Sequence, residues 1–360
     1  MIKHKGHDVH EGKDKLLNLC DLVSFVFRKG FMKFLIAGLG SIGRRHFRNL
    51  ISLGEKDIVL LRSHRATLPD DELAGYPVET NLDEALKKYK PDAVIISNPT
   101  ALHLDIAIPC ANAGCSILIE KPISNSLDRV DELASALRQG GGRLLVGFQF
   151  RFHPTLQKAA QLLKDNAIGK PLSFHAHWGE YLPNWHPWED FKQGYAARPD
   201  LGGGVVLTLT HPLDYLRMLL GEVDSLWAFM NNSNLELEVE DAAEIGLKMK
   251  SGALGSVHLD YNQQPPSHCW EIVGSKGTMK WDNASGNLDV YSAEEKDWTT
   301  YQPPAGFERN VMFIEEMKHF ISVVQKKEKP ICTLDDGKQA LRLALAAHES
   351  NEKGTLVKLG

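Results

Sequence analysis

Glu120 and Lys121 form a charged pair that directly follows the apolar run at residues 117–119. Such a run is typical of a buried parallel strand, so the pair falls at its carboxyl end, where α/β sheets place ligands. A desolvated lysine beside a positively charged ring has a lowered pKa and can exchange a proton with an alcohol or ketone. Glu120 can orient this lysine or bind a cofactor. From spacing alone, a surface ion pair explains the two residues equally well.

A glycine-rich loop follows the apolar run at residues 34–37 and opens a helical pattern. Its sequence is Gly38-Leu39-Gly40-Ser41-Ile42-Gly43. The first glycine permits a tight turn, the second lets a pyrophosphate approach the backbone, and the third allows close helix packing. The helix N-terminus adds positive potential. The glycines alone would also suit a plain tight turn, but the strand and helix on either side favour a dinucleotide site.

The second apolar run, at residues 58–61, is followed by Arg62, Ser63 and Arg65 instead of a carboxylate. A carboxylate at this point would accept hydrogen bonds from an adenosine ribose and repel a 2′-phosphate. The cationic side chains can instead pair with that phosphate. We therefore favour NADP over NAD, although Arg62 stacked on adenine would suit either dinucleotide.

A polar turn, Asn98-Pro99-Thr100, ends the run at residues 93–96 and is followed by His103. Strand ends of this kind border the cofactor crevice, so we expect the turn to lie beside the nicotinamide ribose. A histidine near a helix start is also a common packing or capping residue, which leaves the role of His103 open.

The first part of the chain alternates short apolar runs with amphipathic stretches. The runs are residues 34–37, 58–61, 93–96, 117–119 and 144–146, and the helical stretches are 43–53, 103–113 and 126–138, the last with Ser126 as its expected N-cap. This alternation predicts a doubly wound parallel sheet over residues 32–150, a Rossmann domain.

After residue 150 the pattern changes to alternating strands separated by turns. Strands are expected at 172–178, 225–231, 242–249, 254–261, 270–273 and 278–281, with helices at 154–165, 311–327 and 334–352. The pattern predicts an α+β domain over residues 151–360 with a large open, mainly antiparallel sheet. The two last helices either brace this domain or pack back on the first.

Several motifs occur in an order that resembles the Gfo/Idh/MocA family, which includes glucose-fructose oxidoreductase and inositol 2-dehydrogenase. The motifs are the glycine-rich loop, the turn at 98–103, Glu120-Lys121-Pro122, Gly147-Phe148-Gln149-Phe150-Arg151-Phe152, Gly202-Gly203-Gly204 with His211, and the turn at 274–278. The resemblance extends from about Met32 to the C-terminus. It implies an NAD(P)-dependent oxidoreductase that moves hydride between nicotinamide and a carbinol or carbonyl carbon of a sugar, amino sugar, nucleotide sugar or cyclic polyol.

The resemblance also assigns roles to individual residues. It implies that Lys121 is the catalytic lysine with a cis bond to Pro122, and that His211 is the second acid–base group. By the same resemblance Gln149 and Arg151 lie on the substrate side of the domain junction.

One departure from the family pattern concerns Thr208, which stands where many members carry an aspartate. This leaves Lys121 and His211 as the acid–base pair, with Thr208 expected to bind the substrate. Asp214 lies one helical turn after His211 and is a candidate to orient it, although capping or solvation explains it equally well.

The segment at residues 180–189, Glu-Tyr-Leu-Pro-Asn-Trp-His-Pro-Trp-Glu, is dense in aromatic and hydrogen-bonding side chains. Aromatic faces pack against sugar C–H surfaces, so we interpret Trp185, His186 and Trp188 as substrate-binding residues. Alternatively, the two tryptophans form the core of a loop.

Composition restricts the partners and the compartment. A net charge of −5 gives no attraction to nucleic acid or anionic lipid, and the apolar stretch within residues 1–31 is too short for a membrane span. The five cysteines form no Cys-x-x-Cys pair, so neither a disulfide framework nor a metal site is predicted and a cytoplasmic protein is expected. Residues 1–31 are interpreted as a dispensable extension.

An exposed sheet needs cover, and the family resemblance implies that the second sheet associates in a homodimer or homotetramer, so we expect a cytoplasmic homo-oligomer that acts on a small sugar-like substrate. Two other functions stay open. One is an enzyme of the same fold that retains its dinucleotide and hydrolyses or epimerises a sugar without net redox change. The other is a dinucleotide-sensing regulator.

Overall fold

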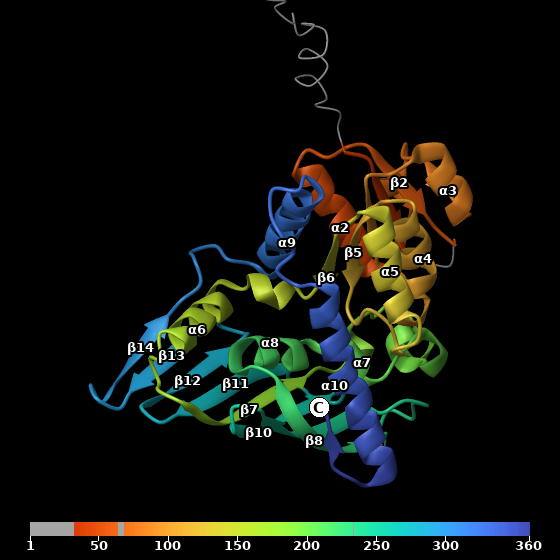
Figure 1. The fold of residues 1–360 in the computed structure, drawn as a ribbon. Helices are drawn as coiled ribbons and strands as arrows, with labels where there is room; N and C mark the ends of the chain where they lie inside the picture. The colour runs from red at the N-terminus through yellow and green to blue at the C-terminus, as the bar shows by residue number, and fades with distance from the viewer. Residues whose placement is uncertain (1–31, 64–67, 233) are drawn as a thin grey trace, which may run out of the picture.

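The computed structural model describes residues 32–63, 68–232 and 234–360. Two sheets organise it, a parallel sheet built by the first part of the chain and a larger sheet built by the second (Figure 1). Neither the expected extension at residues 1–31 nor Arg65 falls within the described residues. No helix in the described ranges is long and apolar enough to cross a membrane.

The first sheet contains six parallel strands in the order β3-β2-β1-β4-β5-β6. They are β1 (Phe34–Ala37), β2 (Ile58–Leu61), β3 (Val78–Glu79), β4 (Ala93–Ile96), β5 (Ser116–Glu120) and β6 (Leu144–Gly147). The intervening helices are α2 (Ser41–Ser52), α3 (Leu82–Tyr89), α4 (His103–Asn112) and α5 (Val130–Gly140). This order reverses between β1 and β4, which confirms the doubly wound fold and places the cofactor crevice at the carboxyl ends of those strands.

Helix α5 corrects one expectation. It begins at Val130 after Arg129, four residues beyond Ser126, which instead accepts a 3.3 Å hydrogen bond from the amide of Asp128. Serine side chains stabilise local turns as readily as helix starts, and the sequence alone did not distinguish the two.

The second sheet contains nine strands in the order β14-β13-β12-β11-β7-β10-β9-β8-β15. They are β7 (Pro171–Gly179), β8 (Val223–Asn231), β9 (Ala242–Met249), β10 (Leu254–Asp260), β11 (Ser267–Gly274), β12 (Gly277–Asp282), β13 (Leu288–Ser292), β14 (Asp297–Tyr301) and β15 (Val357–Lys358). Only β7 and β10 pair in parallel. The expected large, mainly antiparallel sheet is therefore confirmed.

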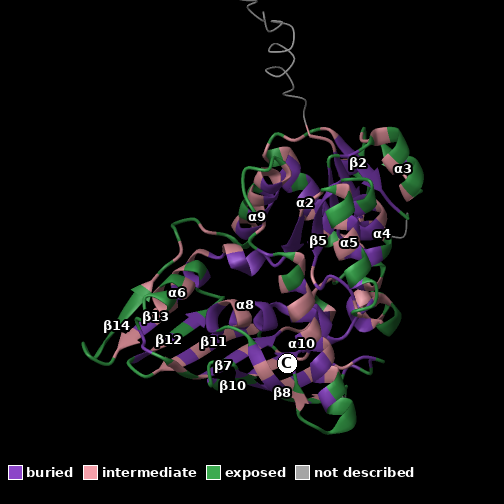
Figure 2. Cartoon of the chain, viewed as in Figure 1, coloured by how far each residue is buried: buried purple, intermediate pink, exposed green. Residues whose placement is uncertain are grey.

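Helices cover the face of this sheet that points toward the first domain, as Figure 1 shows for α6 and α8. The helices of the second part are α6 (Pro154–Lys164), α7 (Val205–Thr208), α8 (His211–Leu220), α9 (Arg309–Val324) and α10 (Leu334–Lys353). Helix α9 packs back on the first domain, where Asn310 donates a 3.0 Å hydrogen bond to Asn49 of α2. Figure 2 shows the parallel sheet buried, the second sheet buried except toward its β14 edge, and the outer helix surfaces exposed.

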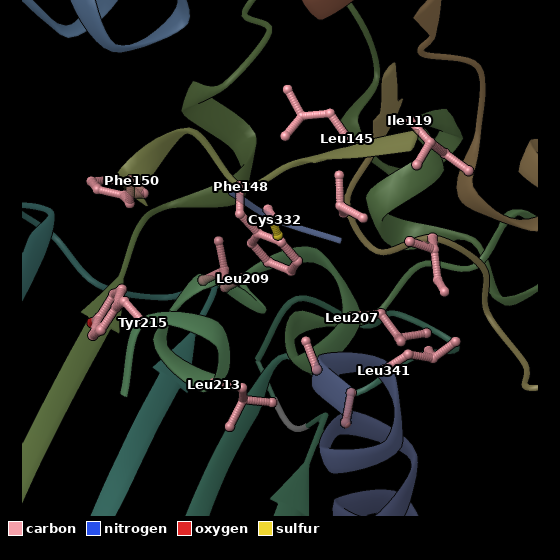
Figure 3. Packing of buried hydrophobic residues seen from close by; sticks show 14 of the residues in the cluster. Ile119, Leu145, Phe148, Phe150, Leu207, Leu209, Leu213, Tyr215, Cys332 and Leu341 are labelled. Atoms are coloured by element: carbon pink, nitrogen blue, oxygen red, sulfur yellow. The ribbon is translucent and has the colours of Figure 1, made fainter. Parts of the chain in front are cut away.

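The apolar core is continuous across the two domains. Figure 3 shows Ile119 and Leu145 of the parallel sheet, Leu213 of α8 and Leu341 of α10 gathered around Cys332. Because these side chains come from both parts of the chain, the core fixes the carboxyl edge of the parallel sheet against α7 and α8.

Candidate active site

The glycine-rich loop joins β1 to α2 and has the geometry that a dinucleotide requires. Gly38 has φ of +89°, and a Cβ atom there would collide with the backbone of Asn98. A Cβ at Gly43 would collide with the carbonyl oxygen of Gly38, whereas Gly40 faces open space. The loop thus leaves room for a pyrophosphate at the start of α2, where Ser41 is exposed and Ile42 half-buried. The residues present fit the cofactor.

Arg62 does not stand free at the end of β2. Its Nη2 atom lies 2.8 Å from Oδ1 of Asp70, and Arg44 of α2 contacts the same carboxylate oxygen at 3.1 Å. Ser63 is exposed beside this cluster. The sequence contained the two arginines but gave no sign that Asp70 lies between them.

His103 holds the turn at residues 98–100 in place. Its Nδ1 lies 2.9 Å from the carbonyl oxygen of Pro122 and its Nε2 lies 2.9 Å from that of Asn98. Burial lowers the pKa of His103 despite these contacts. The imidazole therefore ties the turn after β4 to the segment after β5. Pro99 precedes the short helical turn in which Thr100 is buried.

Glu120 ends β5 with its carboxylate buried, 2.7 Å from Nε2 of His46 on α2. Burial acts to raise the pKa of Glu120, but the hydrogen bond and charge of His46 and the charge of Lys121 outweigh it, and the pKa is lowered. Glu120 is therefore an anion fixed beneath the crevice.

Lys121 reaches from the parallel sheet to the second domain. Its Nζ donates a 2.7 Å hydrogen bond to the backbone carbonyl of Thr208, at the end of α7. The Lys121–Pro122 bond is cis, which confirms that prediction. Burial, with a smaller contribution from the charge of Arg309, lowers the pKa of Lys121, although Glu120 and Glu180 act to raise it. The amine therefore loses its proton more readily than an exposed lysine.

His211, the first residue of α8, lies in an aromatic cage. The ring centroids of Phe148, Phe150 and Trp178 are 5.4, 5.0 and 5.4 Å from that of His211. Its Nδ1 is buried without a hydrogen-bond partner. Burial, followed by the charge of Lys121, lowers the pKa of His211 well below its usual value. The imidazole is neutral and close enough to Lys121 to share its electrostatic environment.

Asp214 does not orient His211. Both of its carboxylate oxygens are bound by Arg151, at 2.9 and 2.6 Å, and Asp336 of α10 lies 3.3 Å from the same guanidinium. One helical turn separates Asp214 from His211, but the paired side chain points toward Arg151. Arg151 also donates to the carbonyl of Ile331 at 2.7 Å, and Gln149 is buried nearby in the same short helix. This cluster fixes the start of the second domain to α8 and α10.

The segment at residues 180–189 divides between packing and exposure. Trp185 packs edge-on against Tyr261, with ring centroids 5.6 Å apart, whereas Trp188 is 59% exposed. His186 lies beside Trp188 at 5.3 Å. Trp185 therefore packs within the loop, whereas His186 is half-buried and Trp188 exposed, so these two side chains remain accessible.

The structure adds residues that sequence reasoning did not assign to the site. Tyr195 lies close to Glu120, and burial, with a smaller effect of that charge, raises its pKa to about 12. Arg309 at the start of α9 acts electrostatically on Lys121 and His211. The sequence carried no signal for Arg309, since nearly two hundred residues separate it from Lys121 along the chain.

Comparisons with known proteins agree with this geometry. An oxidoreductase family model described as having an NAD-binding Rossmann fold matches residues 32–148, and a GFO/IDH/MocA C-terminal domain model matches residues 156–280. A myo-inositol 2-dehydrogenase of Thermotoga maritima is 28% identical, over 91% of this chain and 98% of that protein. A D-xylose 1-dehydrogenase (NADP(+)) of Haloferax volcanii is 26% identical, over 91% and 100%.

Solved structures share the fold at lower identity. A levoglucosan dehydrogenase in complex with NADH and levoglucosan gives a TM-score of 0.81 at 20% identity, covering 91% of this chain and 99% of that one. The WlbA dehydrogenase from Bordetella pertussis, in complex with NADH and UDP-GlcNAcA, gives 0.76 at 20% identity with the same coverage. Together with the fingerprint and the buried Lys121, these matches show that the chain belongs to the Gfo/Idh/MocA family of nicotinamide-dependent oxidoreductases that act on CH–OH groups.

Proposed function

We propose that the protein oxidises or reduces one carbinol or carbonyl carbon of a sugar, amino sugar, nucleotide sugar or cyclic polyol held between the two domains. The observation that carries the proposal is that Lys121, half-buried and bound to the carbonyl of Thr208, and the buried His211 lie in one electrostatic environment at the carboxyl edge of the parallel sheet, both with lowered pKa values. The names of the relatives, among them inositol and xylose dehydrogenases, support this substrate class.

In this mechanism the neutral amine of Lys121 accepts the hydroxyl proton of the substrate as the carbinol is oxidised. A dinucleotide held by the glycine-rich loop would supply the hydride acceptor for this oxidation. The carbonyl of Thr208 orients the amine, since it already binds Nζ at 2.7 Å. His211 stays neutral and hydrogen-bonds the same oxygen, and the reverse reaction returns the proton from Lys121.

The loop at residues 38–43 and the turn at residues 98–100 would hold the dinucleotide, with Glu120 and His103 fixing the turns around it. His186, Trp188, Thr208 and Gln149 would line the substrate side. Arg151 lies at the junction but is committed to Asp214, so we assign it to fixing the short helix at 149–152 against α8. We place the domain boundary near residue 150, between β6 and α6.

We propose NADP as the preferred dinucleotide. The support is the absence of a carboxylate at residues 62–65 and the presence of Arg62, whose partner Asp70 is half exposed and free to turn toward solvent. The 2′-phosphate would then replace Asp70 as the partner of the guanidinium.

We also propose a cytoplasmic homo-oligomer. The uncovered face of the second sheet exposes Trp227, Phe229 and Leu254, of which Phe229 is 70% exposed. Four cysteines in the described part of the chain are unpaired, as expected in a reducing compartment. Light scattering of the purified protein should give twice or four times the monomer mass, and Phe229→Ser should reduce it.

The test of the activity is the absorbance of reduced nicotinamide, followed with purified protein, NAD or NADP, and a panel of sugars, polyols and nucleotide sugars. Turnover that disappears in Lys121→Met would support the proposal. If dinucleotide binds but no compound changes its redox state, a retained-cofactor enzyme or a regulator would explain the protein better.

A further inference from the structure

The amine of Lys121 is half-buried at the acid–base site and has an incomplete set of counter-charges. Lys121 lies beside Glu120, but the Glu120 carboxylate is already bound to His46 at 2.7 Å. Thr208, the residue whose carbonyl binds Nζ, carries a hydroxyl that cannot hold a negative charge at neutral pH. Arg309 adds positive charge to the same region.

Glu180 is positioned to supply the absent charge. It directly follows β7, which ends at Gly179. The indole Nε1 of Trp178 donates a 2.9 Å hydrogen bond to Oε1 of Glu180, while the same indole ring lies 5.4 Å from His211. The backbone of Glu180 is anchored by a 3.0 Å bond from its amide to the carbonyl of Asp260.

Trp178 is itself fixed, so Glu180 has a defined place. The indole stacks on His268 with ring centroids 4.2 Å apart and an interplanar angle of 4°. It holds one carboxylate oxygen of Glu180 on the His211 side of the sheet. The second oxygen has no hydrogen-bond partner among the described residues.

We propose that Glu180 is a positioning residue, supplying the negative charge that balances Lys121 on the side of the site where Thr208 carries none. The proposal rests on the role assigned to Lys121 in the proposed function. The charged and titratable groups around the amine are Glu120, Glu180, Arg309 and His211, from β5, the end of β7, α9 and α8. Of the two carboxylates, Glu180 is the one not bound to a histidine.

The test measures the proton affinity of Lys121 directly and needs neither substrate nor turnover. The full-length protein is labelled with trace acetic anhydride at a series of pH values, and mass spectrometry reports the labelled fraction of Lys121 against exposed Lys164 as the internal reference. In Glu180→Gln we expect the midpoint of Lys121 labelling to move to lower pH by about one unit, because an opposite charge favours the ammonium form. Glu180→Asp keeps the charge, so its Lys121 midpoint should lie close to that of the unaltered protein.

Glu271→Gln is the matched control. Glu271 of β11 pairs with Lys280 of β12 and not with Lys121. Its Lys121 midpoint should equal that of the unaltered protein. Equal midpoints in Glu180→Gln and the unaltered protein, with retained thermal stability, would overturn the inference; so would a shift that Glu180→Asp does not reverse. A negative result here leaves the proposed activity untouched, since that depends on the redox assay.

Discussion

Two buried charged clusters lie at the domain junction, and they are built in opposite ways. In the Arg151 cluster the guanidinium binds both oxygens of Asp214, approaches Asp336 and donates to a backbone carbonyl. In the Lys121 cluster the amine has one carbonyl partner and the neighbouring His211 leaves Nδ1 unpartnered. Both clusters are desolvated, but only the first is saturated with hydrogen bonds.

The difference separates stability from chemistry. A saturated buried cation keeps its proton, and accordingly the pKa of Arg151 is raised, since the hydrogen bond and charge of Asp214 outweigh the effect of burial. A desolvated cation with too few hydrogen-bond partners has a lowered pKa and can exchange its proton at neutral pH, as we find for Lys121. We therefore expect changes in the first cluster to affect folding, and changes in the second to affect turnover.

The largest expected effect is on turnover in Lys121→Met. Loss of the proton acceptor should lower kcat by about 1,000-fold, within the range for removal of a general base. The unfolding temperature should stay the same or rise, because an incompletely paired buried amine is replaced by an apolar side chain. Steady-state absorbance and thermal melting measure the two quantities.

The exposed Lys164→Met at the end of α6 is the control and should match the unaltered protein in both measurements. Retention of more than a tenth of the turnover in Lys121→Met would remove Lys121 from the acid–base pair.

The second expected effect is on stability in Asp214→Asn. Burial raises the pKa of Asp214 even though Arg151 opposes this. The attraction between the two charges therefore does little more than offset the free-energy cost of removing the carboxylate from water. Loss of the carboxylate nevertheless leaves a buried guanidinium underpaired, which costs about 3 kcal/mol. Denaturant unfolding should show this loss.

Asp200→Asn breaks the exposed pair with Arg198 and provides the control, with little or no expected change in stability, because solvent screens the pair. Equal losses in the two variants would show that burial does not distinguish the clusters.

These two clusters also show what the sequence could and could not predict. The strands of the parallel sheet follow from local apolar runs, and the glycine-rich loop follows from the spacing of its glycines, so both are predicted closely from the sequence. Arg151 and Asp214 are separated by 63 residues, and only the packing of α8 against the short helix at 149–152 brings them together. Helical spacing left open whether Asp214 orients His211, caps the helix or is solvated, and none of these alternatives included its pairing with Arg151.

Strands without a strong apolar alternation were also missed. The expected strands ended at residue 281, whereas β13 and β14 continue the sheet. Residues 297–300 of β14 are exposed, so no buried face marked that strand in the sequence. The pairing of Arg62 with Asp70 is another contact that depends on the course of a loop and not on a pattern.

The buried histidines extend the comparison, because they are kept neutral by burial without a counter-charge. Burial lowers the pKa of His153 to about 4, whereas an unfolded histidine titrates near 6.5. Below pH 6.5 the unfolded chain therefore binds a proton that the folded chain does not, and stability falls until the folded pKa is reached. At pH 5 His153 alone should cost about 2 kcal/mol.

Unfolding at pH 7 and pH 5 measures this loss, which should be about 2 kcal/mol smaller in His153→Gln. His319, which lies 2.7 Å from Glu328, is the control histidine, and His319→Gln should retain the loss. An unchanged pH dependence in His153→Gln would show that this imidazole is not kept neutral.

The smallest expected effect tests the limit of the comparison. Arg62 is a partnered cation, so by the rule above it should be structural, yet we assign it to the 2′-phosphate of NADP. The two assignments are compatible because the side chain of its partner Asp70 is 56% exposed, whereas the Asp214 side chain that binds Arg151 is only 3% exposed.

Arg62→Ala should weaken NADP binding about 10-fold and leave NAD binding nearly unchanged, as expected for the loss of one charged hydrogen bond. Asp70→Asn should favour NADP, since it frees the guanidinium. Fluorescence titration with each reduced dinucleotide measures both affinities, and equal weakening of NAD and NADP in Arg62→Ala would return Arg62 to the structural class.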